Sequence, residues 1–179
     1  MLDDVKKVLI DEGALQKRVK ELAIQITEDY RDKDLLMICI LKGGVVFTSD
    51  LMKLINLPLA IDFMAVSSYG SSTKSSGVVR IQKDLDQEIE GKDVLIVEDI
   101  VDTGLTLHYL IENLLSRKPA SLKVCCCLDK PERRVADIHV DYVGFNIPDE
   151  FVIGYGLDFA EKYRNLPYIG VLSENVYSK

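Results

Sequence analysis

Three continuous apolar runs of strand length are separated along the chain by patterns of helical spacing. The runs cover residues 35–41, 94–98 and 122–128. Apolar runs without polar alternation are typical of strands that are buried on both faces of a parallel sheet. The pattern therefore predicts an α/β fold with a central, mainly parallel, twisted sheet flanked by helices.

Three helices are predicted from apolar residues that recur every three or four positions. One lies near the N-terminus, one follows the first apolar run, and one follows the second. Their apolar positions are Leu15, Val19, Leu22, Ala23 and Ile26; Phe47, Leu51, Leu54 and Ile55; and Leu107, Leu110, Ile111, Leu114 and Leu115. With 179 residues and neither an internal repeat nor a linker, we expect one domain over 1–179.

A serine- and glycine-rich stretch, "SSYGSSTKSSG" at 67–77, lies between the strand-like segments "LAIDFMAV" and "VVRIQKDL". Its composition favours a flexible surface loop. A loop of this length within a compact domain is also often an active-site lid, and the residues alone leave both interpretations open.

The composition is that of a soluble globular protein, with 47% hydrophobic and 28% charged residues. The net charge of −7 argues against sequence-independent binding to nucleic acid, which relies on basic surface. The longest apolar run, 35–41, is far shorter than the roughly 20 residues that a membrane span needs. Since the N-terminus "MLDDVKKVLI" does not resemble a secretory signal, we expect a cytoplasmic protein that binds no membrane.

Three of the four cysteines are consecutive, at Cys125, Cys126 and Cys127, inside the third apolar run. Successive side chains of a strand point to opposite faces, so these three cannot bind one metal ion together. We interpret them as small, reduced core residues.

The second apolar run leads directly into polar residues in "VLIVEDIVDTGLTL" at 94–107. Loops at the carboxyl ends of parallel strands bind ligands in α/β proteins. Here "DTGLT" supplies the hydroxyls of Thr103 and Thr106, the flexible Gly104 and backbone N–H groups at the start of the predicted 107–115 helix, which together would bind a phosphate.

The carboxylates next to this turn would repel a phosphate unless they faced something else. Glu98 and Asp99 would suit a divalent cation or the hydroxyls of a sugar, so a phosphorylated ribose fits the whole motif. The alternative is that these acids cap the helix and face water. "LKGG" at 41–44 is a weaker candidate for a second anion site, with Lys42 and Gly43 following the first strand.

The segment 94–107 is similar to the signature with which type I phosphoribosyltransferases bind 5-phosphoribosyl 1-pyrophosphate (PRPP). "LKGG", "SSYGSSTKSSGVVRIQKDL", "LDKPERR" and "GFNIPDEFVIGYGLDFAEKYRNLPYIGVL" resemble the successive motifs of hypoxanthine-guanine phosphoribosyltransferases, and the match covers nearly the whole chain. The resemblance implies a Mg²⁺-dependent purine salvage enzyme that converts hypoxanthine or guanine and PRPP to the nucleoside monophosphate and pyrophosphate.

The resemblance also implies roles for the residues of 94–107. Glu98 and Asp99 would hold the ribose hydroxyls, directly or through Mg²⁺, and Asp102 would take the proton of an imidazole-ring nitrogen of the purine. The 5-phosphate would be bound by the turn that comprises Thr103, Gly104, Leu105 and Thr106.

The purine would be bound by residues that come later in the chain. By the resemblance, Lys130 would donate to the 6-oxo group and so select hypoxanthine or guanine over adenine. Phe151 would stack on the base, and the backbone of Val152 would meet the edge that carries guanine's amino group. Without the resemblance, Lys130 would be interpreted as a surface lysine and Phe151 as a core aromatic residue.

Pyrophosphate would be bound by Lys42, Gly43 and Arg164, with Asp158 at the purine site facing a second metal ion. The family also allows a cis peptide bond before Lys42. From the residues alone, Asp158 and Arg164 would be interpreted as a surface ion pair.

The remaining expectations concern the whole molecule. The resemblance implies a lid over about 67–80 in which Ser68 and Tyr69 close over the reacting centre. It further implies a hood formed by the N-terminal segment and the chain from about 145, and a homodimer or homotetramer. Leu105 and Glu150 stand where animal members commonly have lysine.

Two alternatives to hypoxanthine or guanine salvage remain at this point. A PRPP-sensing regulator would share the 94–107 signature, although such regulators add a DNA-binding domain or a basic face, and this chain has neither spare length nor basic charge. The second alternative is a salvage enzyme whose main base is xanthine.

Overall fold

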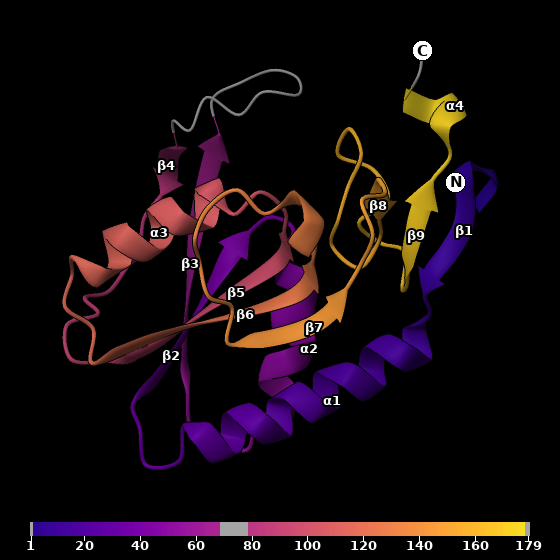
Figure 1. Cartoon of the computed structure of the whole chain (residues 1–179). Coiled ribbons are helices and arrows are strands. Elements are labelled where there is room, and N and C mark those ends of the chain that lie inside the picture. The colour runs from indigo at the N-terminus through magenta and orange to yellow at the C-terminus, as the bar shows by residue number, and fades with distance from the viewer. Residues whose placement is uncertain (1, 69–78, 178–179) are drawn as a thin grey trace.

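The structure, a computed structural model, describes residues 2–68 and 79–177. Its larger sheet has six strands in the order β4-β3-β2-β5-β6-β7 (Figure 1). All neighbours pair in parallel except β4, which is antiparallel to β3 at one edge. This confirms the predicted mainly parallel sheet, whose strands are β2 (Leu35–Leu41), β3 (Ala60–Ser68), β4 (Val79–Lys83), β5 (Asp93–Val101), β6 (Ser121–Asp129) and β7 (Tyr142–Asn146).

Helices cover both faces of this sheet, as the continuous apolar strands predict. α1 (Glu12–Asp29) and α2 (Val45–Leu54) pack on one face, and α3 (Leu105–Leu115) packs on the other. Residues of β5 alternate between the two cores, so that Leu95 contacts the α1 and α2 side while Ile96 contacts the α3 side. The central strands β2, β5 and β6 are therefore buried on both faces over most of their length.

The three predicted helices are present, with two errors in their apolar faces. All five apolar positions predicted for α1 are buried, and the Asp11 carboxylate caps this helix by accepting from the Ala14 N–H at 2.8 Å. Leu54 and Leu115, however, are 45% and 52% exposed. α2 ends at Leu54, and the extended residue Ile55 takes the buried position instead. Leu115 lies one residue beyond the buried Leu114, about 100° around the helix.

The three consecutive cysteines are core residues, as predicted. Cys125 and Cys127 pack on the α1 and α2 side, whereas Cys126 packs on the α3 side. All three are buried free thiols. Burial raises the pKa of each thiol, so each stays protonated and unreactive at neutral pH.

A second, antiparallel sheet forms a hood at one end of the molecule (Figure 1). Its strand order is β1-β9-β8, so both ends of the chain meet in it. The hood thus consists of the N-terminal segment and of strands from the chain beyond 145. Its elements are β1 (Val5–Ile10), β8 (Val152–Ile153) and β9 (Ile169–Leu172), with the short helices η1 (Leu2–Asp4) and α4 (Glu174–Tyr177) beside them.

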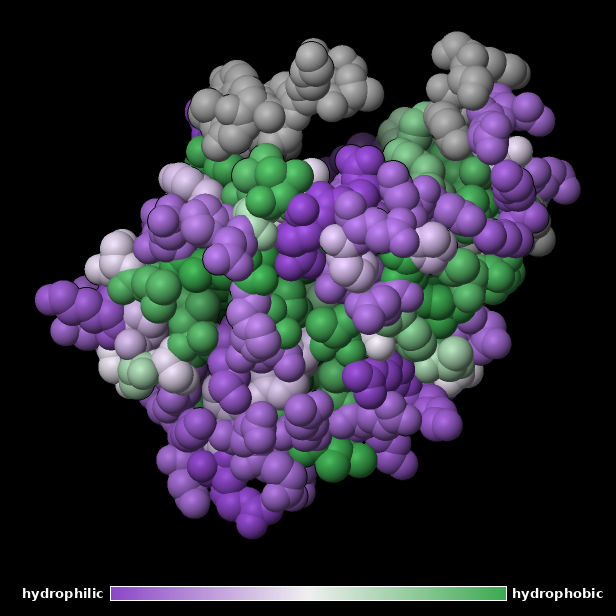
Figure 2. All heavy atoms as spheres, viewed as in Figure 1, coloured by the Kyte–Doolittle hydropathy of each residue, from purple (hydrophilic) through white to green (hydrophobic). Residues whose placement is uncertain are grey.

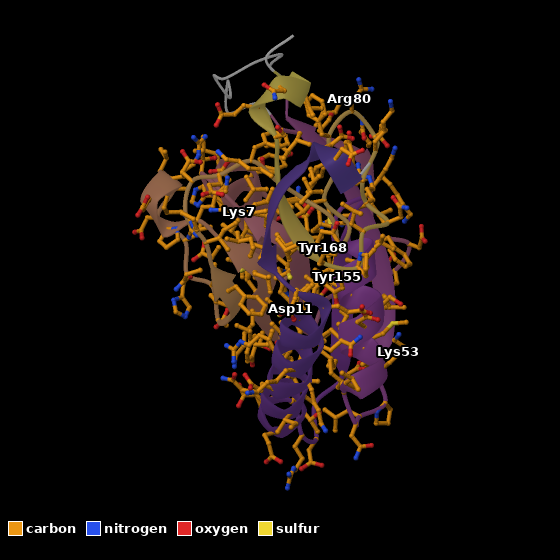
Figure 3. The ribbon with its side chains drawn as sticks, turned by 90° about the vertical axis from the view of Figure 1, so that its right-hand side faces the viewer. Lys7, Asp11, Lys53, Arg80, Tyr155 and Tyr168 are labelled. Carbon is orange, nitrogen blue, oxygen red and sulfur yellow. The ribbon has the colours of Figure 1, made fainter. Side chains whose placement is uncertain are left out.

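The segment between β8 and β9 fastens the hood to the main sheet. Gly156 has a φ of +102°, and a Cβ there would lie 2.1 Å from the Gly43 carbonyl oxygen, so only glycine fits. Tyr155, which is labelled in Figure 3, donates from its hydroxyl to the Asp50 carboxylate of α2 at 2.8 Å. These contacts hold the hood beside the carboxyl end of β2.

The face of the molecule that Figure 2 shows is largely polar. On the face seen in Figure 2, hydrophilic residues cover most of the surface and hydrophobic ones are scattered between them. Among the helices that the structure describes, none has the length and apolar character needed to cross a bilayer.

Candidate active site

The two predicted anion sites lie side by side at the carboxyl ends of β2 and β5. These strands are neighbours in the sheet, and the helices that follow them pack on opposite faces. A crevice opens at such a reversal of connection, and α/β proteins bind their ligands there. Gly43 lies directly against Asp99, because a Cβ at Gly43 would fall 1.6 Å from the Asp99 Oδ2.

The structure corrects the predicted position of the acidic pair. β5 continues to Val101 through pairing with β6, so Glu98 and Asp99 lie within the strand and not after it. The predicted strand stopped at Glu98, the first acidic residue, whereas the ladder uses backbone groups and is indifferent to side-chain polarity. Both carboxyl groups are consequently held by a rigid strand.

Glu98 is a buried carboxyl group, only 8% exposed, and it interacts with the carboxyl group of Asp99. Burial raises the pKa of Glu98 well above its usual value, and the charge of Asp99 raises it further. Burial also raises the pKa of Asp99, although its hydrogen bond from the Ile100 N–H opposes the shift. In the ligand-free protein the pair therefore holds a proton that an exposed pair would lose.

Replacing Glu98 by glutamine should stabilise the ligand-free protein at pH 8 by about 1–2 kcal/mol. Above pH 4.5 an unfolded glutamate has lost its proton while the folded pair still binds one, so this pair makes stability fall as the pH rises toward the raised pKa. Glutamine does not titrate, so the Glu98→Gln variant does not lose stability in this way as the pH rises. Its thermal midpoint should exceed that of the wild type by about 3–6 °C at pH 8, and the difference should shrink toward pH 4.5.

The matched control is Glu90→Gln, which makes the same chemical change at an exposed site. Its midpoint should follow the wild type at every pH. A Glu98→Gln midpoint that is below the wild type at pH 8, or a difference that does not change with pH, would contradict the raised pKa of the pair.

The turn between β5 and α3 has the features of a phosphate site. Gly104 has a φ of +80° and, as the N-cap residue of α3, has no side chain that could cap the helix. The Leu105 N–H donates to the Thr103 hydroxyl at 3.5 Å, and the next N–H groups of the first turn have no side-chain partner among the described residues, so they could donate to an anion. The helix begins at Leu105, earlier than the predicted 107, so Thr106 lies in its first turn. Thr103, Thr106 and Glu98 line one pocket.

Lys130 lies at the end of β6 and is 7% exposed, so the interpretation as a surface lysine is wrong. Its ammonium donates to the Glu150 carbonyl oxygen at 2.7 Å and to Asp149 Oδ1 at 3.4 Å. The backbone bond from the Lys130 N–H to the Val101 carbonyl oxygen fixes it beside β5. Charge alone predicts exposure, and the sequence does not reveal that two acceptors from a distant loop cover this lysine.

The Phe151 ring is 43% exposed, which is unusual for a large aromatic side chain and contradicts its interpretation as a core residue. It meets the ring of Phe159 edge to face, with centroids 5.6 Å apart. Val152 is buried in β8, where its backbone pairs with Val171 of β9. The exposed ring of Phe151 is therefore attached next to a backbone segment that is held by strand pairing in the hood.

Arg164 bonds two residues of the hood segment that lies next to β2. Its guanidinium donates to the Gly156 carbonyl oxygen at 2.7 Å and pairs with Asp158 Oδ1 at 2.8 Å, so the ion pair expected from the residues alone is present. Lys42, which follows a cis peptide bond as the family allows, pairs with Glu161 of the hood at 2.9 Å. Cations from both lobes thus lie around Gly43.

The three residues predicted as metal ligands do not form a single cluster. Asp158 pairs with Arg164 in the hood, while Glu98 and Asp99 lie on β5. Within 2–68 and 79–177, no three His, Cys, Asp or Glu side chains meet in a way that could hold a metal ion.

Comparison with known proteins gives one consistent result. The phosphoribosyl transferase domain model matches residues 8–160. The hypoxanthine-guanine phosphoribosyltransferase of Bacillus subtilis is 57% identical, and the match covers 99% of this chain and 98% of that one. The chain belongs to the hypoxanthine-guanine phosphoribosyltransferase family.

Further members of this family are nearly as similar. The enzyme of that name from Mycobacterium tuberculosis is 56% identical over 97% of this chain and 89% of its own. A crystal structure of a hypoxanthine phosphoribosyltransferase from Staphylococcus aureus superimposes with a TM-score of 0.97 at 56% identity, covering all of this chain (100%) and 97% of that one. The type I phosphoribosyltransferase fold inferred from the sequence is confirmed.

One expectation drawn from the family, the lid over about 67–80, falls partly outside the described residues. Of the predicted lid, Tyr69 and most of 67–80 lie there, and Ser68 is the last residue of β3. Their roles in closing the site stay predictions.

Two charged residues of the candidate site were not assigned a role from the sequence. Arg133, in the short helix η2 (Pro131–Arg133), donates to Asp102 Oδ1 at 2.6 Å. Asp149 accepts from Arg133 at 3.2 Å and from Lys130. The sequence shows only that "LDKPERR" and "PDE" are rich in charged residues. It does not reveal which of these residues form ion pairs with one another.

Proposed function

We propose that this protein is a purine salvage enzyme that transfers the 5-phosphoribosyl group from PRPP to hypoxanthine or guanine, giving IMP or GMP and pyrophosphate. The observation that carries the proposal is that three unlike groups meet at the carboxyl ends of neighbouring strands. They are an acidic pair with a buried Glu98, a helix start without a side-chain cap from its N-cap residue, and the buried Lys130. The names of relatives that are 57% and 55% identical, over 98% and 90% of their own length, support the same reaction.

The ribose and its phosphate would be bound at the end of β5. Glu98 and Asp99 would hold the ribose hydroxyls, and the Thr103–Gly104–Leu105–Thr106 turn would bind the 5-phosphate with backbone N–H groups and hydroxyls. The pair of Glu98, which is buried, and Asp99, which is partly exposed, fits Mg²⁺, which prefers hard oxygen donors and typically takes only one or two carboxylates beside substrate phosphates. When bound, Mg²⁺ supplies positive charge that stabilises the departing pyrophosphate.

The purine would be bound between the main sheet and the hood. Lys130 would donate to the 6-oxo group, Phe151 would stack on the ring, and the Val152 backbone would meet the opposite edge. Asp102 would take the proton from the imidazole-ring nitrogen as the new bond to the ribose forms, which is general base catalysis. The burial of Lys130 and the exposure of Phe151 support these two assignments.

Pyrophosphate would be bound around Gly43, with Lys42 and Arg164 as the cations. Asp158 would lie at the purine site and face a second Mg²⁺. Both cations are paired with hood carboxylates in the ligand-free protein, so binding would exchange those partners for phosphate oxygens. Ser68 and Tyr69 would close over the bound substrates and exclude water.

We further propose a cytoplasmic homodimer or homotetramer that binds neither nucleic acid nor membrane. The net charge of −7 supports the absence of nucleic-acid binding.

A spectrophotometric assay with Mg²⁺, PRPP and each of hypoxanthine, guanine, xanthine and adenine tests the function. We expect conversion of hypoxanthine and guanine, no conversion of adenine, and loss of activity when EDTA removes Mg²⁺. If xanthine alone were converted, the assigned base would be wrong. If PRPP bound while no base was consumed, the protein would be a PRPP sensor and not an enzyme.

A further inference from the structure

Four charged side chains form a continuous chain of ion pairs across the candidate purine site. Arg133 Nε donates to Asp102 Oδ1 at 2.6 Å, and Arg133 Nη1 donates to Asp149 Oδ2 at 3.2 Å. The other oxygen of Asp149, Oδ1, accepts from Lys130 Nζ at 3.4 Å. We call Asp102, Arg133, Asp149 and Lys130 the ion-pair chain.

The ion-pair chain joins three separate parts of the fold. Asp102 follows β5, Lys130 and Arg133 lie at the end of β6 and in η2, and Asp149 precedes β8 of the hood. Single exposed ion pairs contribute little to stability, and Arg133, Asp102 and Asp149 have side chains that are 43%, 42% and 49% exposed. A stabilising role therefore does not explain this arrangement, whereas a geometric role does.

The two ends of the ion-pair chain match two neighbouring atoms of a 6-oxopurine. The 6-oxo oxygen and N7 of the imidazole ring lie on the same edge of the base. Lys130 and Asp102 are the groups proposed to bind these atoms. Their separation must consequently match one edge of one rigid ring.

Each end also keeps a free position for the substrate. Arg133 bonds one oxygen of Asp102, and Oδ2 has no hydrogen-bond partner among the described residues. Lys130 has three donors, of which the Glu150 carbonyl and Asp149 take two. One acceptor and one donor are thus left at the two ends.

We propose that Arg133 and Asp149 are positioning residues that fix the proton acceptor Asp102 and the 6-oxo donor Lys130 at the separation of one purine edge. This inference rests on the proposed function. The planar guanidinium of Arg133 presents donors in a rigid fork, so it orients the Asp102 carboxylate with Oδ2 toward the base. Asp149 extends the same constraint to the ammonium of Lys130.

Removing the guanidinium of Arg133 should slow the chemical step and leave PRPP binding unchanged. We expect Arg133→Gln to lower the single-turnover rate of nucleotide formation about 10- to 100-fold, which is the usual effect of misplacing a reacting group. Asp149→Asn, which breaks the same chain from the other side, should lower the rate in the same direction. The dissociation constant of PRPP should not change, because neither side chain belongs to the proposed phosphate or ribose site.

A double-mutant cycle distinguishes positioning from general damage to the fold. If Arg133 acts through the Asp102 carboxylate, Arg133→Gln should have almost no effect on the rate in an Asp102→Asn background. Arg31→Gln is the control, since Arg31, which follows the end of α1, forms an exposed ion pair with Glu28 at 2.9 Å. It should leave every rate at its starting value.

Two results would overturn the proposal. One is an unchanged single-turnover rate in Arg133→Gln; the other is an equal loss in the wild-type and Asp102→Asn backgrounds, which would reveal a purely structural role. Failure of the proposed function is seen separately, because the wild-type protein itself would then form no nucleotide from any base.

Discussion

Asp102→Asn should lower the single-turnover rate of IMP formation by about 10²–10⁴-fold, the range in which general base catalysis contributes. The side chain keeps its size and an oxygen that Arg133 can bond, so the surrounding geometry should persist. What it loses is the ability to accept the purine proton. Single turnover is the appropriate measurement because product release limits the steady-state rate of many enzymes.

The control for this variant is Asp32→Asn. Asp32 is exposed, far from the candidate site in sequence, and has a φ of +62°, a conformation that asparagine also adopts readily. Its rate should equal that of the wild type, and both variants should bind PRPP normally. If Asp102→Asn retained a rate within about threefold of the wild type, Asp102 would not be the group that takes the proton.

Lys130→Met should lower kcat/KM for hypoxanthine by roughly 30- to 150-fold, because a hydrogen bond from a charged donor contributes about 2–3 kcal/mol. Methionine fills most of the space of the lysine stem but cannot donate. Adenine presents a donor at position 6, so the variant should lose discrimination: kcat/KM for hypoxanthine should fall toward that for adenine. Initial rates with both bases would measure this ratio.

Lys17→Met, an exposed change on α1, serves as the matched control and should leave both rates unaltered. Lys130→Arg keeps the charge with a different shape and should not restore the rate, because the pocket holds a compact ammonium between Asp149 and the Glu150 carbonyl. An unchanged preference for hypoxanthine over adenine in Lys130→Met would exclude Lys130 as the group that reads the 6-oxo position.

The candidate site was predictable where its chemistry lies within one segment. The turn from Asp102 to Thr106 can be identified because acids, hydroxyls and glycine follow one another after an apolar run. Its electrostatic state was not predictable. The raised pKa of Glu98 depends on burial by other strands, and no local pattern around Glu98 encodes that burial.

Long-range pairs were the least predictable part of the site. Arg133 and Asp102 are 31 residues apart, and Lys130 and Asp149 are 19 apart. Each belongs to a charged segment that could equally well face water. Which carboxylate each cation binds is decided only when η2 and the loop before β8 are brought to the end of β5.

The sequence by itself determined the three long helices, the central strands of the parallel sheet and the segments that carry the chemistry. These follow from the spacing of apolar residues and from motifs whose members are neighbours in the chain, and both are local properties. Only the tertiary structure decided that Gly43 lies against Asp99, that Lys130 is buried and that Arg133 bonds Asp102. Such contacts arise from the packing of distant segments, because burial and ion pairing depend on which segments become neighbours in space.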